Sequence, residues 1–184
     1  VITPRPLIKH VEGIKLELQL RYEIILKELI LMFKNRKDVE IIFKLHPQQN
    51  FHNDVIKSTI TKFNPKIQIL QDESINEVLK KANFLINISP DNLDASTVVF
   101  ESMLQEIPII NIKLQKNTWI YDFEKMNAVK SFEFDSNFKD GILQIIDNLD
   151  LQNSQINNIR KFLEFYFYNK KSASENLVNF ISKN

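Results

Sequence analysis

The sequence predicts an α/β fold, a doubly wound parallel sheet of about six strands with a helical C-terminus. Short runs rich in β-branched and aromatic residues alternate with amphipathic segments of about ten or more residues, a pattern typical of parallel strands joined by helices. The length of 184 residues suits one domain with its own hydrophobic core. The chain has no cysteine, which excludes disulfides, thiolate catalysis and cysteine-bound zinc.

In the first half of the chain, prolines and a capping pattern set the element boundaries. A strand over residues 1–3 ends at a Pro-Arg-Pro turn, because each proline disfavours helix for the residue before it. Apolar residues at helical spacing predict a long helix over 14–33, and the run VEIIFKL at 39–45 predicts a strand that stops before a His-Pro pair. Ser74 and Glu77 form an S-x-x-E capping box that would open another helix. This helix would cover residues 75–82. Before it we expect a helix over residues 54–63 and a strand over residues 67–70.

The second half repeats the alternation and ends in helices. The segment from Asn83 to Ile112 reads as a buried strand, a polar loop, a helix and a second buried strand, over residues 84–88, 89–94, 95–105 and 109–112. A long loop over 113–127 holds the only tryptophan, Trp119. We then expect one strand and three helices, over residues 130–134, 138–149, 156–168 and 174–181.

The expected strand order places a binding crevice. If the order is the doubly wound 3-2-1-4-5-6, the strand at 1–3 lies beside the strand at 84–88, and the order reverses between them. Ligands of open parallel sheets bind beyond the carboxyl ends of the strands at such a point. We therefore expect the crevice to be lined by the loop over 4–13, by residues 89–97 and by His46 at the end of the neighbouring strand.

Charge and glycine content restrict the ligands. Twenty-four basic against 23 acidic residues give a net charge of +1, so no global field would gather nucleic acid, and anion binding must be local. With only two glycines, Gly13 and Gly141, the chain cannot contain a G-x-G-x-x-G or Walker-type loop. The longest apolar stretch, 24–33, is interrupted by charges and is shorter than the roughly 20 residues of a membrane span. Phosphate, if bound, would be held by helix ends and side chains.

The start of the helix at 95–105 carries the first candidate site. Asp94 stands at a plausible N-cap, and Ser96 and Thr97 lie on the first turn beside free backbone N–H groups, where phosphate oxygens would find donors. The competing interpretation is that these residues only cap the helix. Glu101 lies one turn further on roughly the same face and could accept hydrogen bonds from both ribose hydroxyls, although acidic residues of helices are commonly solvated.

Basic residues are expected on the same crevice. His46 could donate to a phosphate or protonate a leaving group, and it is the one candidate catalytic residue; alternatively, it only bonds to backbone at a strand end. Arg5, Lys9 and His10 could neutralise a diphosphate, although each is also consistent with a solvated surface charge. The carboxylates of the 89–94 loop are more typical of turns and caps than of a metal site, so we assign no metal and expect no cofactor.

An aromatic run near the C-terminus predicts a partner surface. The run is apolar nearly all around a helix and consists of Phe162, Leu163, Phe165, Tyr166, Phe167 and Tyr168. The core of one domain does not satisfy every side of such a helix, so we expect contact with another domain or a second copy. Deep burial of the helix is the alternative.

Two motifs resemble those of the C-terminal, donor-binding domain of GT-B fold glycosyltransferases. They are KLHP (Lys44 to Pro47) and DASTVVFESMLQEIPII (Asp94 to Ile110), which are similar to the His-Pro and Ser/Thr-x-x-x-acid signatures of capsule-polysaccharide, sialyl- and glycerophosphate-type transferases. The resemblance implies a Rossmann-like domain in which His46 and the Ser96/Thr97 pair contact the donor phosphates and Glu101 contacts the ribose. The chain departs from the family at Ile107, where the family often has glycine before the proline.

The resemblance implies a function for residues 1–184 as a single nucleotide-sugar-binding domain. It would be the donor-binding half of a glycosyltransferase that uses a CMP-, CDP- or UDP-linked sugar or polyol in surface-glycan synthesis. In that family, the glycan acceptor site and the catalytic base usually belong to an N-terminal domain, so we expect a fragment that binds without turnover. Two alternatives remain open: half of a UDP-N-acetylglucosamine 2-epimerase-like enzyme, and a non-catalytic Rossmann-like interaction module. We expect a cytoplasmic location, with a peripheral position at the membrane left open.

Overall fold

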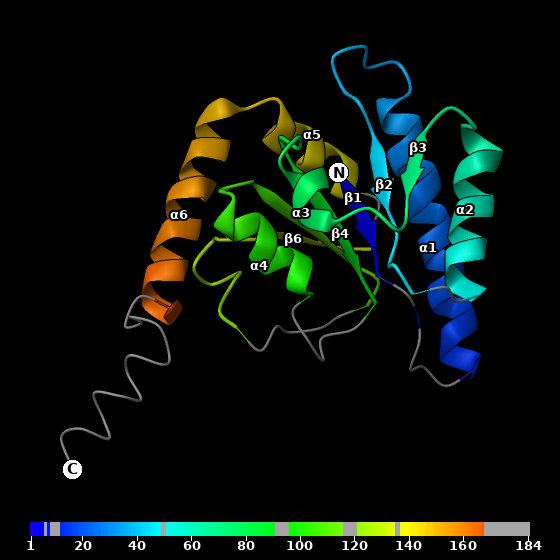
Figure 1. The fold of residues 1–184 in the computed structure, drawn as a ribbon, viewed down its shortest axis with the longest axis horizontal. Helices are drawn as coiled ribbons and strands as arrows, with labels where there is room; N and C mark the ends of the chain where they lie inside the picture. Colours follow the sequence, from blue (N-terminus) through cyan, green and yellow to red (C-terminus); the bar gives the residue numbers. More distant parts are fainter. Residues whose placement is uncertain are drawn as a thin grey trace.

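The computed structural model describes residues 1–5, 7, 12–48, 51–90, 96–115, 121–134 and 137–167. Its strands are β1 (Ile2–Pro4), β2 (Ile42–Lys44), β3 (Gln68–Leu70), β4 (Leu85–Ser89), β5 (Ile109–Lys113) and β6 (Lys130–Glu133). They form one six-stranded sheet in the order β3-β2-β1-β4-β5-β6, in which every neighbouring pair is parallel (Figure 1). The predicted Rossmann-like fold and strand order are therefore confirmed.

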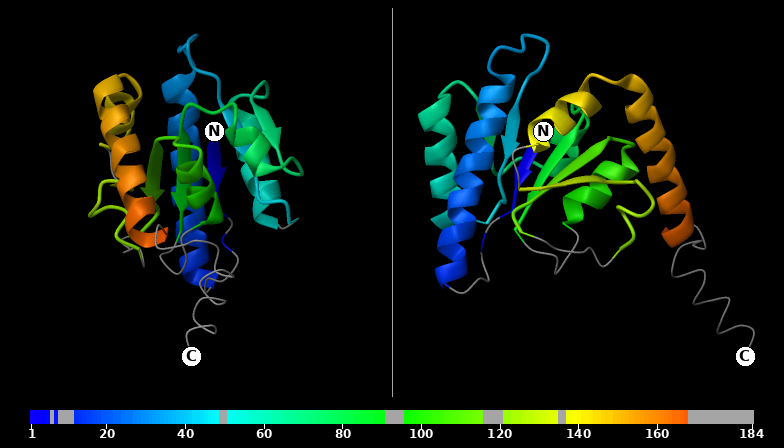
Figure 2. Two further views of the ribbon diagram at one scale, coloured as in Figure 1. Left: turned by 60° about the vertical axis from the view of Figure 1, so that its left-hand side comes forward. Right: turned by 180° about the vertical axis from the view of Figure 1, so that it is seen from behind.

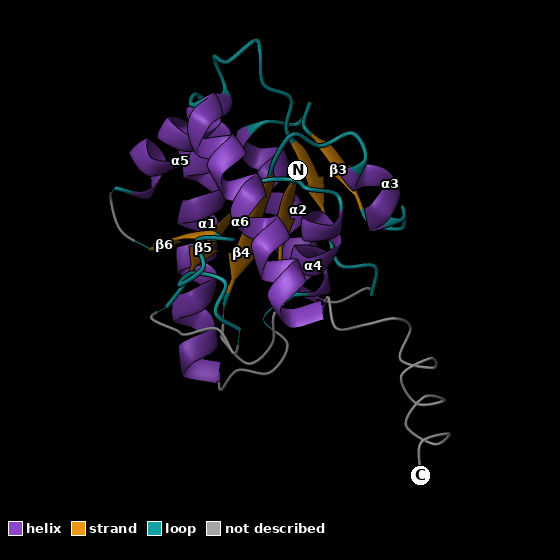
Figure 3. Cartoon of the chain, turned by 90° about the vertical axis from the view of Figure 1, so that its left-hand side faces the viewer, coloured by secondary structure: helices purple, strands orange, loops and turns teal. Residues whose placement is uncertain are grey.

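Helices cover both faces of the sheet (Figure 2). The helices are α1 (Glu12–Phe33), α2 (Phe51–Phe63), α3 (Ile75–Leu79), α4 (Thr97–Leu104), α5 (Phe138–Ile146) and α6 (Leu149–Phe167). One hydrophobic core joins α1, α2 and α5 to the sheet, and a second core joins α3, α4 and α6 to the opposite face. The helical C-terminus packs beside α4 in this second core (Figure 3).

The two cores follow from the alternation of side chains along β4 and β5. All five residues of each strand are buried, as expected for central strands covered on both faces. On one side, isoleucines enter the core beneath α1 and α5, whereas the side facing α4 combines Leu85 and Ile109 with buried polar residues. These polar residues are Asn87, Ser89, Asn111 and Lys113. The α4 side of the sheet is therefore polar near the carboxyl ends of its strands.

Several predicted boundaries were wrong. Helix α4 begins at Thr97 with Ser96 as its N-cap, so Asp94 is not the cap residue, and Asp94 itself lies outside the described residues. Ser74 is the N-cap of α3 but its side chain makes no capping hydrogen bond, and Glu77 instead accepts a hydrogen bond from Lys80 Nζ at 2.6 Å. The expected capping box is thus absent from α3, because the acidic side chain pairs along the helix.

Helix α6, the last helix among the described residues, begins seven residues earlier than predicted, at Leu149 rather than 156. Its start has a local cause, since the Leu151 N–H donates to Asn148 Oδ1 at 3.0 Å, which is the hydrogen bond of an N-cap asparagine. Strand β2 is shorter than the predicted 39–45, and α5 ends at Ile146. The predicted helix at 174–181 and Trp119 lie outside the described residues.

The aromatic run on α6 is not uniformly exposed. Phe162 is fully buried, whereas Phe165 is 72% exposed and Phe167 is 42% exposed. The ring of Phe162 packs 4.8 Å from that of Phe123 and 4.6 Å from that of Tyr166, measured between centroids. One side of the helix is thus satisfied by the domain's own core, and the partner surface remains a prediction for the exposed side.

Replacing Gly141 by alanine is expected to destabilise the domain by about 1 kcal/mol. A Cβ at Gly141 would overlap the ring of Phe132, which packs directly against this position of α5. Overpacking typically costs about 1–3 kcal/mol, which exceeds the gain of roughly 1 kcal/mol that alanine brings to a helix interior. Urea denaturation measures the difference, with Gln144→Ala on the exposed side of the same helix as the control. An unchanged or higher stability of Gly141→Ala would show that the ring of Phe132 moves aside without penalty.

Candidate functional site

A pocket of about 240 Å³ lies beyond the carboxyl ends of β1 and β2, between them and the start of α4. The strand order reverses between β1 and β4, so the pocket occupies the expected crevice. Its lining brings together five of the predicted site residues, Arg5, His46, Ser96, Thr97 and Glu101. Their roles remain predictions. Lys9, His10, Asp91 and Asp94 lie outside the described residues, so their positions relative to the pocket are not defined.

The start of α4 supplies hydrogen-bond donors at the pocket. Ser96 is the N-cap, with φ −56° and ψ 132°, and its side chain makes no capping hydrogen bond. Its carbonyl accepts the first-turn hydrogen bond of α4 from the Val99 N–H at 2.9 Å. The amides of the first turn and the positive end of the helix dipole therefore lie at a pocket wall together with the hydroxyls of Ser96 and Thr97. This arrangement suits the oxygens of a phosphate.

Glu101 brings an unpartnered carboxylate oxygen to the same pocket. Its Oε2 is buried and has no hydrogen-bond partner among the described residues. A buried polar oxygen without a partner is unfavourable, because it has lost its hydration without replacement. The hydroxyl groups of a ligand would supply the missing donors. One turn separates Glu101 from Thr97, so an acceptor for hydroxyls follows directly behind donors for phosphate.

The turn that carries His46 is held in place by Asn53 of α2. The side chain of Asn53 is buried, and its Nδ2 donates to the carbonyl of His46 at 2.9 Å and to that of Gln48 at 3.0 Å. The exposed His46 ring accepts a hydrogen bond at Nδ1 from the Gln48 N–H, at 3.1 Å. In the neutral ring the proton is therefore on Nε2, which can donate to a ligand. Sequence reasoning missed Asn53, because an asparagine in a first helical turn has an ordinary capping explanation.

Lys44 is a second residue that sequence reasoning did not single out. Its side chain is only 6% exposed, and Nζ donates to the carbonyls of Leu45 at 2.9 Å and Gln71 at 2.7 Å. Burial lowers the pKa of the Lys44 amine, while the nearby Glu73 and Asp72 carboxylates oppose this effect. The amine links the end of β2 to the segment after β3, and the residue lines the pocket. It therefore places a buried basic group close to the expected phosphate position.

A row of buried polar side chains crosses the sheet, and its members Thr3 and Asn87 line the pocket. Thr3 and Asn87 lie in register on β1 and β4, and Thr3 Oγ1 donates to Asn87 Oδ1 at 3.3 Å. Asn87 Nδ2 donates in turn to Asn111 Oδ1 on β5, at 2.7 Å. The signal for this row was visible in the sequence, where LINIS and IINIK each place an asparagine at the centre of an apolar strand.

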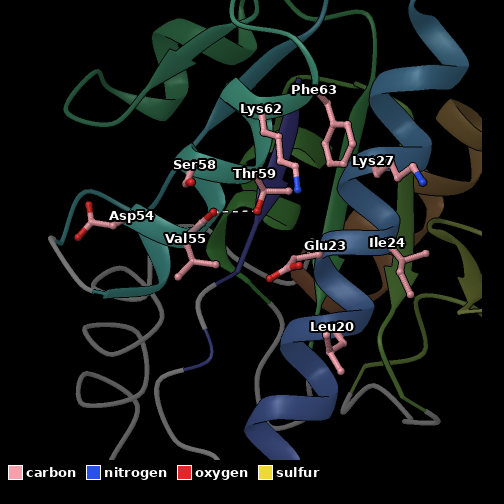
Figure 4. Close-up of a pocket in the computed structure, with 10 residues that line it drawn as sticks. All are labelled: Leu20, Glu23, Ile24, Lys27, Asp54, Val55, Ser58, Thr59, Lys62 and Phe63. Carbon is pink, nitrogen blue, oxygen red and sulfur yellow. Dashed lines mark hydrogen bonds between the residues drawn. The ribbon is translucent and has the colours of Figure 1, made fainter.

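A larger hollow of about 570 Å³ is found between α1 and α2 (Figure 4), but it contains none of the predicted site residues. We consider the smaller pocket the candidate site, because it combines the strand ends, a helix start and an unpartnered carboxylate. Within the described ranges there is no group of three or more potential metal ligands. In the same part of the chain, no helix has both the length and the apolar composition needed to cross a membrane.

No protein-family model matches the sequence, and no curated protein has significant sequence similarity to it. Similarity is found with solved structures. A Listeria monocytogenes protein assigned as a UDP-N-acetylglucosamine 2-epimerase matches with a TM-score of 0.59 and 14% identity, over 84% of this chain and 38% of that protein. A further UDP-N-acetylglucosamine 2-epimerase matches with a TM-score of 0.55 and 12% identity, over 93% of this chain and 44% of that protein.

At these identities the likeness shows the fold alone. The part of each protein that matches shares the Rossmann-like fold of this chain. The chain spans less than half the length of either matched protein.

Proposed function

We propose that this domain binds a nucleotide-linked sugar and forms the nucleotide-binding half of a GT-B fold enzyme. The observation that carries the proposal is the buried Glu101 Oε2, which has no hydrogen-bond partner among the described residues and lies in the same pocket as the start of α4 and His46. A nucleoside phosphate combines the two chemistries that this pocket offers, because its phosphates need donors and its ribose presents two hydroxyls.

The phosphates would lie at the start of α4. Amides of the first turn, the hydroxyls of Ser96 and Thr97, and the cationic Arg5 would hold their oxygens. The Nε2–H of His46 would donate to the phosphate that leaves with the nucleotide when the bond to the sugar breaks. Stabilising the charge of that leaving phosphate accelerates any reaction in which the sugar separates from the nucleotide. Glu101 would bind the ribose and fix the position of the reacting bond.

The leading form of the proposal is the donor-binding half of a glycosyltransferase in surface-glycan synthesis. The donor would be a CMP-, CDP- or UDP-linked sugar or polyol, and residues outside this chain would bind the glycan acceptor. The KLHP motif and the segment Asp94 to Ile110 support this form, since both contribute residues to the pocket.

A second candidate is half of a UDP-N-acetylglucosamine 2-epimerase-like enzyme. The similarity in fold to two proteins of that description favours it. The two candidates differ in whether a second substrate is consumed. Product analysis of the full-length protein distinguishes them, because an epimerase converts the nucleotide sugar without an acceptor and a transferase releases nucleotide only when an acceptor is glycosylated.

Calorimetric titration of the 184-residue chain with CMP, CDP, UMP and UDP tests the shared part of the proposal. We expect at least one nucleotide to bind, and His46→Ala to weaken its binding about tenfold, because a hydrogen bond to a charged group contributes about 1.5–3 kcal/mol. Lys161→Ala, which removes an exposed cation from α6, is the control and should bind as the wild type does. The proposal is wrong if no nucleotide binds, or if His46→Ala binds as tightly as the control.

A further inference from the structure

Helix α1 exposes an apolar stripe on the side that faces away from the sheet. Leu16, Leu20, Ile24 and Leu31 are 63%, 54%, 47% and 42% exposed. Their spacing of four, four and seven residues places them on one side of the 22-residue helix. The other side of α1 is buried in the core, so the helix is apolar on two sides. An exposed apolar stripe of this length is typical of a contact surface.

The stripe borders the hollow of about 570 Å³ between α1 and α2. Leu20 and Ile24 line it from α1, and Val55 and Phe63 line it from α2 (Figure 4). Because both helices contribute apolar side chains, the stripe and the hollow form one continuous surface. This surface does not include the pocket residues at the strand ends.

The charges around the hollow are arranged by sign. On each helix the acidic residue precedes the basic one: Glu23 lies one turn before Lys27 near the middle of α1, and Asp54 lies in the first turn of α2 with Lys62 in the last (Figure 4). None of these four side chains forms an ion pair with another described residue. The surface therefore has an acidic end and a basic end, and at the basic end the amines of Lys27 and Lys62 lie 6.0 and 5.8 Å from the centroid of the Phe63 ring without a carboxylate partner among the described residues.

We propose that this surface binds a second copy of the chain, with the two α1 helices packed antiparallel around a two-fold axis. A two-fold axis reverses the direction of the second copy, so the acidic end of each surface meets the basic end of the other. A partner with one sign of charge would satisfy only one end. A second copy satisfies both ends with the same residues, as an isologous interface requires.

The residue spacing is consistent with such a seam. Leu20, Ile24, Lys27 and Leu31 follow the four-three-four spacing of a coiled-coil interface. An axis between Ile24 and Lys27 brings Leu20 opposite Leu31 of the second copy. The same axis brings the Lys27 amine close to Glu23 of the second copy, so the one cation within the apolar seam gains a carboxylate partner.

Sedimentation velocity of the 184-residue chain tests this inference. We expect a concentration-dependent species of twice the 21.7 kDa mass of the chain. Ile24→Glu should shift it to the monomer, because the substitution places a charge in the apolar centre of the seam. The matched control is Leu149→Glu, which introduces the same change at a leucine that is 67% exposed on α6 and should leave the dimer intact. Circular dichroism checks that both variants remain folded.

A charge exchange tests the two-fold geometry itself. Lys27→Glu should weaken the dimer at least tenfold, because like charges then meet across the axis. Adding Glu23→Lys should restore it, since the exchanged pair again has opposite signs. A wild-type monomer at all concentrations, a dimer that survives Ile24→Glu, or a Lys27→Glu defect that Glu23→Lys does not repair would each overturn the inference. None of these variants alters the pocket residues, so failed nucleotide binding and failed dimerisation are separate results.

Discussion

Glu101→Ala is expected to weaken nucleotide binding about 10- to 100-fold without lowering the stability of the free protein. The loss of affinity follows because hydrogen bonds to a charged group are worth about 1.5–3 kcal/mol, and about 1.4 kcal/mol corresponds to a factor of ten. Stability should not fall, because the variant removes a buried Oε2 that has no partner among the described residues. A residue kept for packing would behave in the opposite way, losing stability and keeping affinity.

The ligand offers a matched test of the same contact. If Glu101 accepts from the ribose hydroxyls, a 2′-deoxynucleotide should bind the wild type more weakly, and Glu101→Ala should no longer distinguish the deoxynucleotide from the ribonucleotide. Calorimetry provides the four affinities of this cycle. Glu164→Ala, at an exposed glutamate on α6, serves as the control and should keep the wild-type preference. Equal discrimination by Glu101→Ala and the wild type would remove the ribose from the vicinity of this carboxylate.

Phe162→Ala is expected to destabilise the domain by about 3–5 kcal/mol, as large-to-small changes of buried aromatics usually do. Phe162 is fully buried, and its ring contacts those of Phe123 and Tyr166. The substitution would leave a cavity between α6 and the segment that precedes β6, because fixed neighbours surround the ring. Urea denaturation, followed by circular dichroism, measures the change in the free energy of unfolding.

The same helix provides the control for this substitution. Phe165 lies three residues away and is 72% exposed, with its ring at the edge of Tyr166. Phe165→Ala should therefore change the free energy of unfolding by no more than about 0.5 kcal/mol, as is usual for surface substitutions. Equal effects at the two positions would contradict the packing of α6 described above, since only one ring is enclosed by the core.

The fold and much of the candidate site could be predicted because both depend on local patterns. Short isoleucine-rich runs such as LINIS and IINIK have few alternatives to a buried parallel strand, and the strand order then follows from general topology. Once that order is given, a residue at a strand end and a residue at a helix start share one crevice. The sequence alone therefore predicts that His46 and Ser96 share one crevice, and both line the pocket.

The remainder could not be predicted because it depends on partners that only the folded chain supplies. Asn53 and Lys44 bond to backbone carbonyls of other segments, and carbonyls are present in every residue, so the sequence carries no sign of these pairings. Glu77 is a different case, because its local i, i+3 pairing with Lys80 replaced the expected capping box. Asn148 did carry a signal, because asparagine is a preferred N-cap residue. The predicted start at 156 rested on apolar periodicity, whereas the cap at Asn148 defines the start of the helix.

The polar row of Thr3, Asn87 and Asn111 has a consequence for how the strands align during folding. A slip of one residue between β4 and β5 would turn the side chain of one asparagine toward the isoleucines beneath α1 and break the hydrogen bond between Asn87 and Asn111. An amide orphaned in the apolar core would cost about 1–3 kcal/mol. Misaligned sheets are therefore penalised at their centre, where apolar strands of isoleucine alone would tolerate a shift. The polar row, of which Thr3 and Asn87 line the pocket, thus also selects the one strand alignment in which that pocket exists.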